Sequence, residues 1–367
     1  MSPYRALSAV VLAAGGGTRM HSRRPKPLHL LCGRPMVLHV LDALAELPID
    51  RVVVVVGHGA ERVTKTLREE APEDLDIELV EQPDQRGTGD AVAVGLTGLP
   101  DGSPESEDGD VLVLPGDAPL LRPPTLASVV RHHRASDAAA TLLTARLDDA
   151  SGHDRVLRGK DERICRVVDD AHATEEERGV AEITTGVFCF RRAVLAPALR
   201  RLMPTRPGGE FVLADTIEVL HQAGHLVANV ELADPMEAAG VNDRSQLAIA
   251  EAELRDRTNT RWMRRGVTML DPETTYIDAT TKLAPDVTLF SGILLQGNCV
   301  IEEGAVIGPD VHLIDTKVGT GARVMQCSAR KGEIGAYARV GPYAVLDPGA
   351  AVADNEVTGP FFHGAAT

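Results

Sequence analysis

The sequence predicts an α/β chain in two parts: a Rossmann-like domain with a mixed, mostly parallel sheet, followed by a left-handed parallel β-helix. In the first part, aliphatic runs that end at glycine alternate with segments of helical pattern. In the last third, aliphatic residues recur every six positions. One long segment between them has the pattern of a helix. We expect the first domain over residues 1–243, a linker helix over 244–270 and the β-helix over 271–367.

Three continuous apolar runs predict strands of the first domain, namely Ser8–Ala14, Arg51–Val56 and Val111–Leu114. Runs of this kind are typical of parallel strands that are buried on both faces. The segments Met36–Glu46 and Gly89–Leu96 between them have helical patterns. Because ligands of open α/β sheets bind at the carboxyl ends of the strands, we expect the functional residues directly after these runs. The acidic segment Ser103–Gly109 is predicted to be a solvated loop.

The segment 244–264 is predicted to be one helix, with Leu247, Ala250 and Leu254 on its apolar side. Beyond it the aliphatic series follows a six-residue period, with one five-residue and one ten-residue step: Ile277, Leu283, Leu289, Leu295, Ile301, Ile307, Leu313, Val318, Val324, Ile334, Val340, Leu346 and Val352. This period matches the hexapeptide β-helix, in which each aliphatic side chain points into a stacked prism. We predict four or five coils and, by analogy with other such solenoids, a homotrimer.

Composition excludes several classes of protein. A chain of 367 residues accommodates two domains, and a formal net charge of −15 argues against a nucleic-acid partner. Its five cysteines are widely spaced without a CxxC pair, which argues against a disulfide framework and a structural zinc site. We find neither a signal peptide nor an apolar stretch of 18 residues, and therefore expect a cytoplasmic protein without a membrane partner.

The strongest chemical signal is the glycine-rich segment Leu12–Met20, which follows the first strand and precedes the segment Pro25–Leu28. Glycine lets backbone N–H groups approach the phosphates of a nucleotide closely. Arg19 and Lys26 could neutralise the charge that develops on those phosphates during transfer. The segment lacks the Gly-Lys-Ser/Thr of a P-loop and the third glycine of a dinucleotide fingerprint. It therefore predicts a triphosphate site of another kind.

Three further motifs stand at the ends of predicted elements. Gln82 offers an amide to a pyrimidine edge and is followed by Gly87-Thr88-Gly89, which could let the backbone approach a base. Asp117 follows the strand that ends at Leu114, and its carboxylate suits Mg²⁺, which shares oxygen ligands with substrate phosphates. Asn242, in Gly240–Asp243, could complete that metal site with its amide oxygen. Taken singly, each is also an ordinary turn or helix cap.

In order and spacing, the motifs Leu12–Met20, Pro25–Leu28, Gly87–Ala91, Gly116-Asp117 and Gly240–Asn242 resemble the GlmU-type N-acetylglucosamine-1-phosphate uridylyltransferases. The resemblance extends over roughly residues 8–265, and the hexapeptide region follows where that family has one. It implies a Mg²⁺-dependent sugar-1-phosphate nucleotidyltransferase that uses UTP and releases pyrophosphate.

The resemblance also implies a role for individual residues. Arg19 and Lys26 would be catalytic, and Asp117 and Asn242 would hold Mg²⁺. The nucleotide would be bound by Leu12, Ala13, Ala14, Gly15, Gly16, Gly17, Gln82, Gly87 and Thr88. The sugar would be bound by Gly152, Asp169 and Thr184, with Arg155 and Gly186 in the same stretches.

The sequence departs from the family pattern in the sugar contacts of the first domain and in the acetyltransferase site of the β-helix. Asp169 stands where the family carries Glu, and Thr184 where it carries Asn, so the sugar contacts are altered. In the β-helix, Asp347 stands where an Arg normally binds the substrate of the family's acetyltransferase reaction. The coils that carry the acetyltransferase histidine lie beyond Thr367 in the family pattern, and we expect this activity to be absent.

Three alternatives remain open from the sequence. The chain could transfer another nucleotide, such as a thymidylyl, guanylyl or cytidylyl group, to a specialised sugar or another phosphate. It could be a non-catalytic trimeric scaffold or regulator with a nucleotide-binding fold. It could also retain acyltransferase activity in the β-helix.

Overall fold

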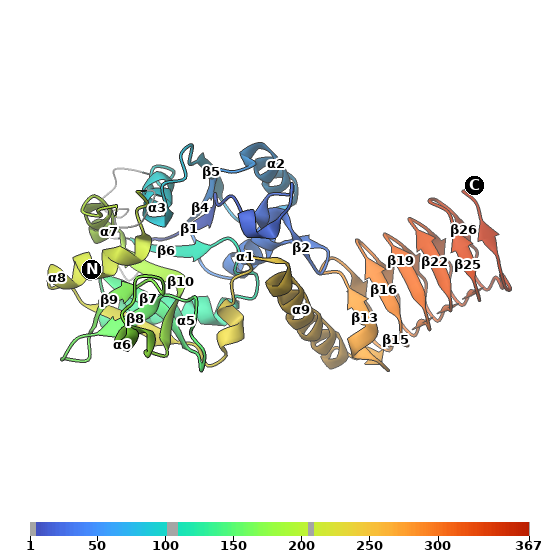
Figure 1. Cartoon of the computed structure of the whole chain (residues 1–367). Helices are drawn as coiled ribbons and strands as arrows, with labels where there is room; N and C mark the ends of the chain where they lie inside the picture. Colours follow the sequence, from blue (N-terminus) through green and yellow to red (C-terminus); the bar gives the residue numbers. More distant parts are fainter. Residues whose placement is uncertain (1–4, 101–108, 205–208, 367) are drawn as a thin grey trace. The chain divides into compact units, whose positions relative to one another are not determined.

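The computed structural model describes residues 5–100, 109–204 and 209–366, so most of the predicted loop Ser103–Gly109 lies outside the described residues. The chain divides into two compact units (Figure 1). The first comprises Met1–His29 and Pro35–Gln246, and the second comprises Leu30–Arg34 and Leu247–Thr367. The predicted ranges 1–243, 244–270 and 271–367 differ from this division, because the linker helix joins the second unit from Leu247 onward and so does the short segment Leu30–Arg34.

The segment Leu30–Arg34 joins the second unit through its backbone. The short strands β2 (Leu30–Leu31) and β3 (Arg34–Pro35) pair with each other around a turn at Cys32. The backbone N–H of Cys32 donates to Glu251 Oε2 of helix α9 (Arg244–Arg264) at 2.7 Å, and the Cys32 carbonyl accepts from Ala279 N at 2.9 Å. Five residues with no apolar period give no sign of such contacts in the sequence.

The first unit is built on one mixed, mostly parallel sheet, as predicted. Within the described residues its order is β11-β7-β10-β6-β1-β4-β5, with β8 and β9 attached beside β10. The bounds are β1 (Leu7–Ala13), β4 (Arg51–Val56), β5 (Ile77–Glu81), β6 (Asp110–Pro115), β7 (Ala140–Arg146), β8 (Arg155–Arg158), β9 (Ile164–Val168), β10 (Glu182–Arg191) and β11 (Val227–Glu231). Strands β6, β1, β4 and β5 run parallel, so their carboxyl ends meet at one edge. Strand β10 runs antiparallel to β6 and β7. The three predicted strands are confirmed.

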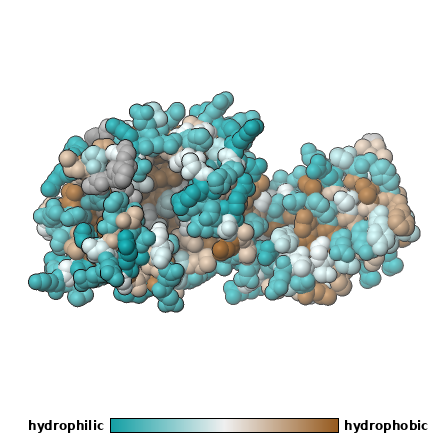
Figure 2. Space-filling model, viewed as in Figure 1, coloured by the Kyte–Doolittle hydropathy of each residue, from teal (hydrophilic) through white to brown (hydrophobic). Residues whose placement is uncertain are grey.

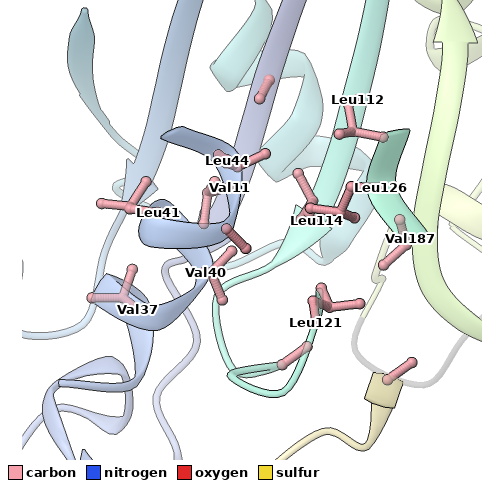
Figure 3. Close-up of a cluster of buried hydrophobic side chains, with 14 of the residues drawn as sticks. Val11, Val37, Val40, Leu41, Leu44, Leu112, Leu114, Leu121, Leu126 and Val187 are labelled. Atoms are coloured by element: carbon pink, nitrogen blue, oxygen red, sulfur yellow. The ribbon is translucent and has the colours of Figure 1, made fainter. Parts of the chain in front are cut away.

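Helices cover both faces of this sheet. Their bounds are α1 (Met36–Ala45), α2 (Ala60–Glu70), α3 (Thr88–Leu96), α5 (Pro123–Ser136), α6 (Glu175–Arg178), α7 (Arg192–Leu199) and α8 (Thr216–Gln222). Ala9 and Val11 of β1 belong to the core beneath α1, α2 and α5, whereas Val10 belongs to the core beneath α3, α7 and α8. This alternation follows from the opposite directions of successive side chains in a strand. Figure 3 shows Val37, Val40, Leu41 and Leu44 of α1 beside Val11 and the β6 leucines.

The second unit is the predicted parallel β-helix, built from stacked parallel sheets, and its hexapeptide period is that of the left-handed class (Figure 1). One sheet contains β12 (Thr268–Met269), β15 (Thr288–Leu289), β18 (Val306–Ile307), β21 (Arg323–Val324) and β24 (Arg339–Val340). Another contains β13 (Thr275–Ile277), β16 (Ile293–Gln296), β19 (Val311–Ile314), β22 (Cys327–Arg330), β25 (Ala344–Leu346) and β27 (His363–Gly364). The last contains β14 (Lys282–Leu283), β17 (Val300–Ile301), β20 (Lys317–Val318), β23 (Glu333–Ile334) and β26 (Ala351–Val352).

All thirteen aliphatic residues of the predicted series are buried in the β-helix core, none more than 8% exposed. The ten-residue step between Val324 and Ile334 contains one further position in register with this series. Ala329 pairs in register with Leu313 on one side and Leu346 on the other, and it is buried. The sequence pattern misses this position because alanine is too small to mark a period of large aliphatic residues.

The surfaces of the two units differ in character. In the view of Figure 2 the first unit is mostly hydrophilic, whereas patches of hydrophobic residues lie on the surface of the β-helix. The exposed residues of the β-helix include Tyr343 and Phe361, whose rings stack with centroids 5.2 Å apart. Among the described residues, no helix is both long and apolar enough to cross a membrane.

Candidate functional site

The glycine-rich loop begins where β1 ends. Gly17 has a φ of 60° and precedes the short 3-10 helix η1 (Thr18–Met20), which carries Arg19. A Cβ placed on Gly17 would lie 2.6 Å from Cβ of Lys26, so glycine at this position makes room for the lysine stem. A Cβ placed on Gly15 would meet no atom within 4 Å, because the loop there faces open space. The backbone at Gly15 is therefore accessible to a ligand.

Four polar residues from distant parts of the chain meet in one cluster, the phosphate cluster Arg19, Lys26, Asp117 and Asn242. Lys26 Nζ forms a close ion pair with Asp117 Oδ2 and donates to Asn242 Oδ1 at 2.8 Å. Arg19 Nη2 donates to the same Asn242 oxygen at 3.0 Å. The backbone N–H of Val241 donates to the Asp117 carbonyl at 2.9 Å, which ties the two loops together. The sequence separates these residues by up to 223 positions.

The oxygen atoms of the phosphate cluster fit one hard cation. Asp117 and Asn242 direct a carboxylate and an amide oxygen at the same ammonium group, and both are ligand types that Mg²⁺ uses. Mg²⁺ commonly takes one or two protein ligands and completes its shell with water and substrate phosphates. Within the residues that the structure describes, no group of three or more His, Cys, Asp or Glu side chains could hold a metal. The predicted metal site would take one carboxylate and one amide oxygen from the protein.

A cavity of about 390 Å³ adjoins the phosphate cluster at the carboxyl ends of β1, β5 and β6. We call it the nucleotide cavity. Its lining includes most of the residues that the sequence assigns to the nucleotide: Leu12, Ala13, Ala14, Gly15, Gly16, Gln82, Gly87 and Thr88, together with Lys26 and Asp117. Gln82 directly follows β5, and its side chain is buried against the start of α3.

The turn before α3 has a backbone that only glycine adopts readily. Gly87 has φ 98° and ψ 177°, and a Cβ there would clash with the carbonyl oxygen of Phe211. Phe211 N donates to the Arg86 carbonyl at 2.8 Å, and Gly89 N donates to the Phe211 carbonyl at 2.8 Å. Thr88 Oγ1 accepts from Leu213 N at 2.9 Å. These bonds hold the turn at the wall of the nucleotide cavity.

A second cavity of about 620 Å³ lies on the other side of the phosphate cluster. We call it the acceptor cavity. It shares Leu12, Thr88, Pro115 and Asp117 with the nucleotide cavity, so the two form one cleft. The predicted sugar residues Gly152 and Thr184 line it, as does Gly186. His153 and Asp154, which sequence reasoning missed, line it as well.

A buried arginine holds the loop that carries Gly152. Arg155 is 2% exposed, forms an ion pair with Asp170 at 2.9 Å and donates to the His153 carbonyl. Asp170 also accepts from Gly152 N at 3.0 Å. The Asp154 carbonyl accepts from Thr184 N at 3.0 Å and so joins the loop to β10. Asp170 is a positioning residue that sequence reasoning missed, because opposite charges 15 positions apart carry no periodic signal.

Asp169, the remaining predicted sugar contact, is placed apart from the acceptor cavity. It lines a separate hollow of about 400 Å³ with His172, Arg201 and Asp215, and that hollow shares no lining residue with either cavity. Its carboxylate accepts from Ala171 N at 2.8 Å and lies 3.2 Å from His172 Nδ1. At the end of β9 the chain turns so that Asp170, not Asp169, reaches the Gly152 loop.

A buried charged group lies at the opposite end of β6 and takes no part in this cleft. Asp110 accepts from Arg134 Nε at 2.7 Å, and His133 Nε2 lies 3.5 Å from its other oxygen. Burial raises the pKa of Asp110, but hydrogen bonds and charge from His133 and Arg134 outweigh it, and the pKa falls below the ordinary value. This group ties α5 to the first residue of the strand.

Comparisons with known proteins identify the family of this chain. Residues 9–220 match the family of MobA-like NTP transferase domains. The chain is 41% identical over 355 residues to the bifunctional protein GlmU of Desulfitobacterium hafniense, an alignment that covers 96% of this chain and 75% of that protein. It is 44% identical over 350 residues to the bifunctional protein GlmU of Streptomyces avermitilis, covering 95% and 71%. It is 39% identical over 353 residues to that of Shouchella clausii, covering 96% and 75%. The chain therefore belongs to the GlmU-type nucleotidyltransferases, and its first unit is a MobA-like NTP transferase domain.

Proposed function

We propose that this nucleotidyltransferase moves a uridylyl group from UTP to a sugar-1-phosphate, with Mg²⁺, and releases pyrophosphate. One observation carries the proposal. The phosphate cluster lies where the nucleotide cavity meets the acceptor cavity, so two cationic groups and two oxygen atoms lie between the two cavities. N-acetylglucosamine-1-phosphate or a related sugar phosphate is the proposed acceptor.

The chemistry requires charge stabilisation more than a protein nucleophile. A sugar phosphate oxygen is already anionic, so it can attack the α-phosphorus in line without a general base. Lys26 and Arg19 would hold and neutralise the phosphates as negative charge redistributes toward the departing pyrophosphate. Asp117 and Asn242 would hold Mg²⁺, which supplies further neutralisation of the phosphates when bound. The glycine-rich loop would present backbone N–H groups to the same charge.

The proposed acceptor is supported by the acceptor cavity and its polar rim. Its size, about 620 Å³, suits a sugar phosphate, and Gly152, Asp154 and Thr184 bring polar groups to its wall. The threonine hydroxyl both donates and accepts, whereas the family's asparagine would bring an amide. Because Asp169 lies in the separate hollow, we expect the sugar contacts to come from the Gly152 loop and β10.

A substrate panel tests the proposal. Each common nucleoside triphosphate is offered with several sugar-1-phosphates and Mg²⁺, and pyrophosphate release is measured. We expect turnover to be fastest with UTP and to require both substrates and the divalent ion. Asp117→Ala is the matched inactive control. Preference for another triphosphate would replace UTP in the proposal. Absence of turnover with every pair, together with no heat of UTP binding in calorimetry, would favour a non-catalytic scaffold instead.

Two further proposals concern the β-helix of the second unit, namely its acetyl-transfer activity and its oligomeric state. The relatives are named bifunctional, yet here Asp347 stands where the resemblance expects an arginine, and it lies 3.1 Å from His363 Nε2. We propose that the β-helix does not transfer acetyl groups, and release of free thiol from acetyl-CoA with glucosamine-1-phosphate would refute this.

We also propose a homotrimer, supported by the exposed hydrophobic residues of the β-helix. Light scattering on the purified chain measures its mass.

A further inference from the structure

The side-chain amide of Gln82 is held in one orientation. Its Nε2 donates to Asp90 Oδ2 at 2.8 Å and to the Gly87 carbonyl at 3.3 Å. A carboxylate and a carbonyl accept hydrogen bonds and donate none, so the NH₂ end of the amide must face them. Gln82 lines the nucleotide cavity and is only 3% exposed. The end that it can offer to a ligand is therefore its oxygen, Oε1, an acceptor.

Asp90 is itself held in place from the other side. Arg86 Nη2 donates to Asp90 Oδ1 at 2.8 Å, and the Asp90 side chain is 12% exposed. Asp90 lies in the first turn of α3, so the helix backbone sets its direction. The result is a chain of three side chains in which Arg86 and Gln82 both donate to Asp90. Because Arg86 can only donate and the Asp90 carboxylate can only accept, Gln82 must be the donor in its bond to Asp90.

We infer that Asp90 is a specificity-determining residue of the nucleotide cavity, which selects a pyrimidine with a ring N–H and rejects cytosine. Uracil carries a hydrogen on N3 and can donate to Gln82 Oε1, whereas N3 of cytosine is an acceptor and would face that oxygen without a proton. Buried polar groups left unpaired in this way discriminate strongly between substrates. The inference rests on the proposed use of UTP and adds the residue that orients the Gln82 amide for it.

The substitution Asp90→Asn tests this with little change of shape. Arg86 only donates, so it keeps the asparagine oxygen on its own side and turns the asparagine NH₂ toward Gln82. Residue 90 then favours the Gln82 oxygen, and this outweighs the longer 3.3 Å bond from Gln82 Nε2 to the Gly87 carbonyl. Gln82 therefore presents its NH₂ to the cavity, which matches N3 of cytosine. We expect the ratio of kcat/KM for UTP to that for CTP to fall by about tenfold or more. KM for the sugar phosphate should not change.

A second substitution provides a rescue that a purely structural role would not give. In the double variant Arg86→Met, Asp90→Asn, nothing holds the asparagine oxygen away from Gln82, so the original orientation of the amide is available again. The preference for UTP should return toward that of the wild type. Asp84→Asn makes the same chemical change at an exposed residue of the same loop and should leave the ratio unaltered. Asp90→Ala leaves only the 3.3 Å bond to the Gly87 carbonyl to orient the Gln82 amide. This variant should also lower the ratio, and it serves if the asparagine variant fails to fold.

The outcomes separate this inference from the proposed function. A wild-type enzyme that turns over no UTP would refute the proposed function. A wild-type enzyme that prefers UTP, with folded Asp90→Asn and Asp90→Ala variants that keep the full UTP-to-CTP ratio, would overturn the inference alone. Loss of the preference in Asp90→Asn without recovery in the double variant would overturn the orienting chain, because the loss would then not depend on Arg86.

Discussion

Substituting Lys26 by Met separates the catalytic effect of the lysine charge from the effect of its side-chain packing on stability. Methionine keeps an unbranched stem, which is what packs over Gly17, and removes the ammonium group that contacts Asp117 and Asn242. Lys26 and Asp117 have side-chain exposures of 12% and 27%, so water reaches both. Because both side chains are part-buried, the loss in free energy of unfolding should stay below that of breaking a fully buried pair, at about 1–3 kcal/mol.

The expected loss in kcat is a separate quantity from this loss in stability. Removing one preorganised group that stabilises developing charge costs roughly 10²–10³ in kcat, or about 2.7–4 kcal/mol. Pyrophosphate release at saturating substrates measures the loss, and urea unfolding measures stability on the same sample. Because the ammonium group lies between the oxygens of Asp117 and Asn242, its removal should also tighten Mg²⁺ binding by the free protein, measured by calorimetry. Undiminished turnover in a folded Lys26→Met protein would refute the catalytic role of the lysine. Unchanged Mg²⁺ affinity would refute the idea that the ammonium group and Mg²⁺ compete for the oxygens of Asp117 and Asn242.

Three other predictions concern the framework around the cleft. Gly87→Ala forces a residue with a Cβ into a glycine-only backbone against the Phe211 carbonyl, and we expect a loss of ~1–3 kcal/mol in urea unfolding with a higher KM for the nucleotide. Asp170→Ala leaves the buried Arg155 without its ion-pair partner, and we expect roughly 3 kcal/mol of destabilisation with a raised KM for the sugar phosphate only. The lowered pKa of Asp110 stabilises the folded state above the ordinary carboxyl pKa of about 3.9, and this stability is lost as the pH falls through the lower folded value. Asp110→Asn should remove that part of the acid dependence in unfolding measured against pH.

Each of these has a comparison within the chain. Gly224 also has a positive φ, but a Cβ there would meet no atom within 4 Å, so Gly224→Ala should cost less than Gly87→Ala. Asp169→Ala shows which of two adjacent acids serves the acceptor, and a larger effect on acceptor KM than that of Asp170→Ala would contradict the placement in separate hollows. An Asp110→Asn protein with an unaltered acid transition would show that Asp110 does not contribute to it.

The sequence by itself determined the two-part architecture, because the patterns that specify it are local. The valine-rich run Arg51–Val56 predicts its strand to the residue, and all thirteen members of the six-residue series are buried in the β-helix core. The membership of the phosphate cluster also follows from residue types, since glycine, cations and oxygen ligands are what a polyphosphate requires. The pair Arg86–Asp90 could have been found as well, because opposite charges four positions apart at the start of a helix are a recognisable pattern.

Only the tertiary structure decided which of these residues act together. Arg19 and Asn242 are 223 positions apart and meet because the parallel strands and the loop before α9 converge at one sheet edge. How the chain turns after β9 decides that Asp170, and not Asp169, contacts the Gly152 loop. The orientation of the Gln82 amide depends on its contact with Asp90. Such facts depend on the direction of a side chain in a packed environment, which neither composition nor period encodes. Local patterns select the elements, whereas long-range packing selects the partners of each polar atom.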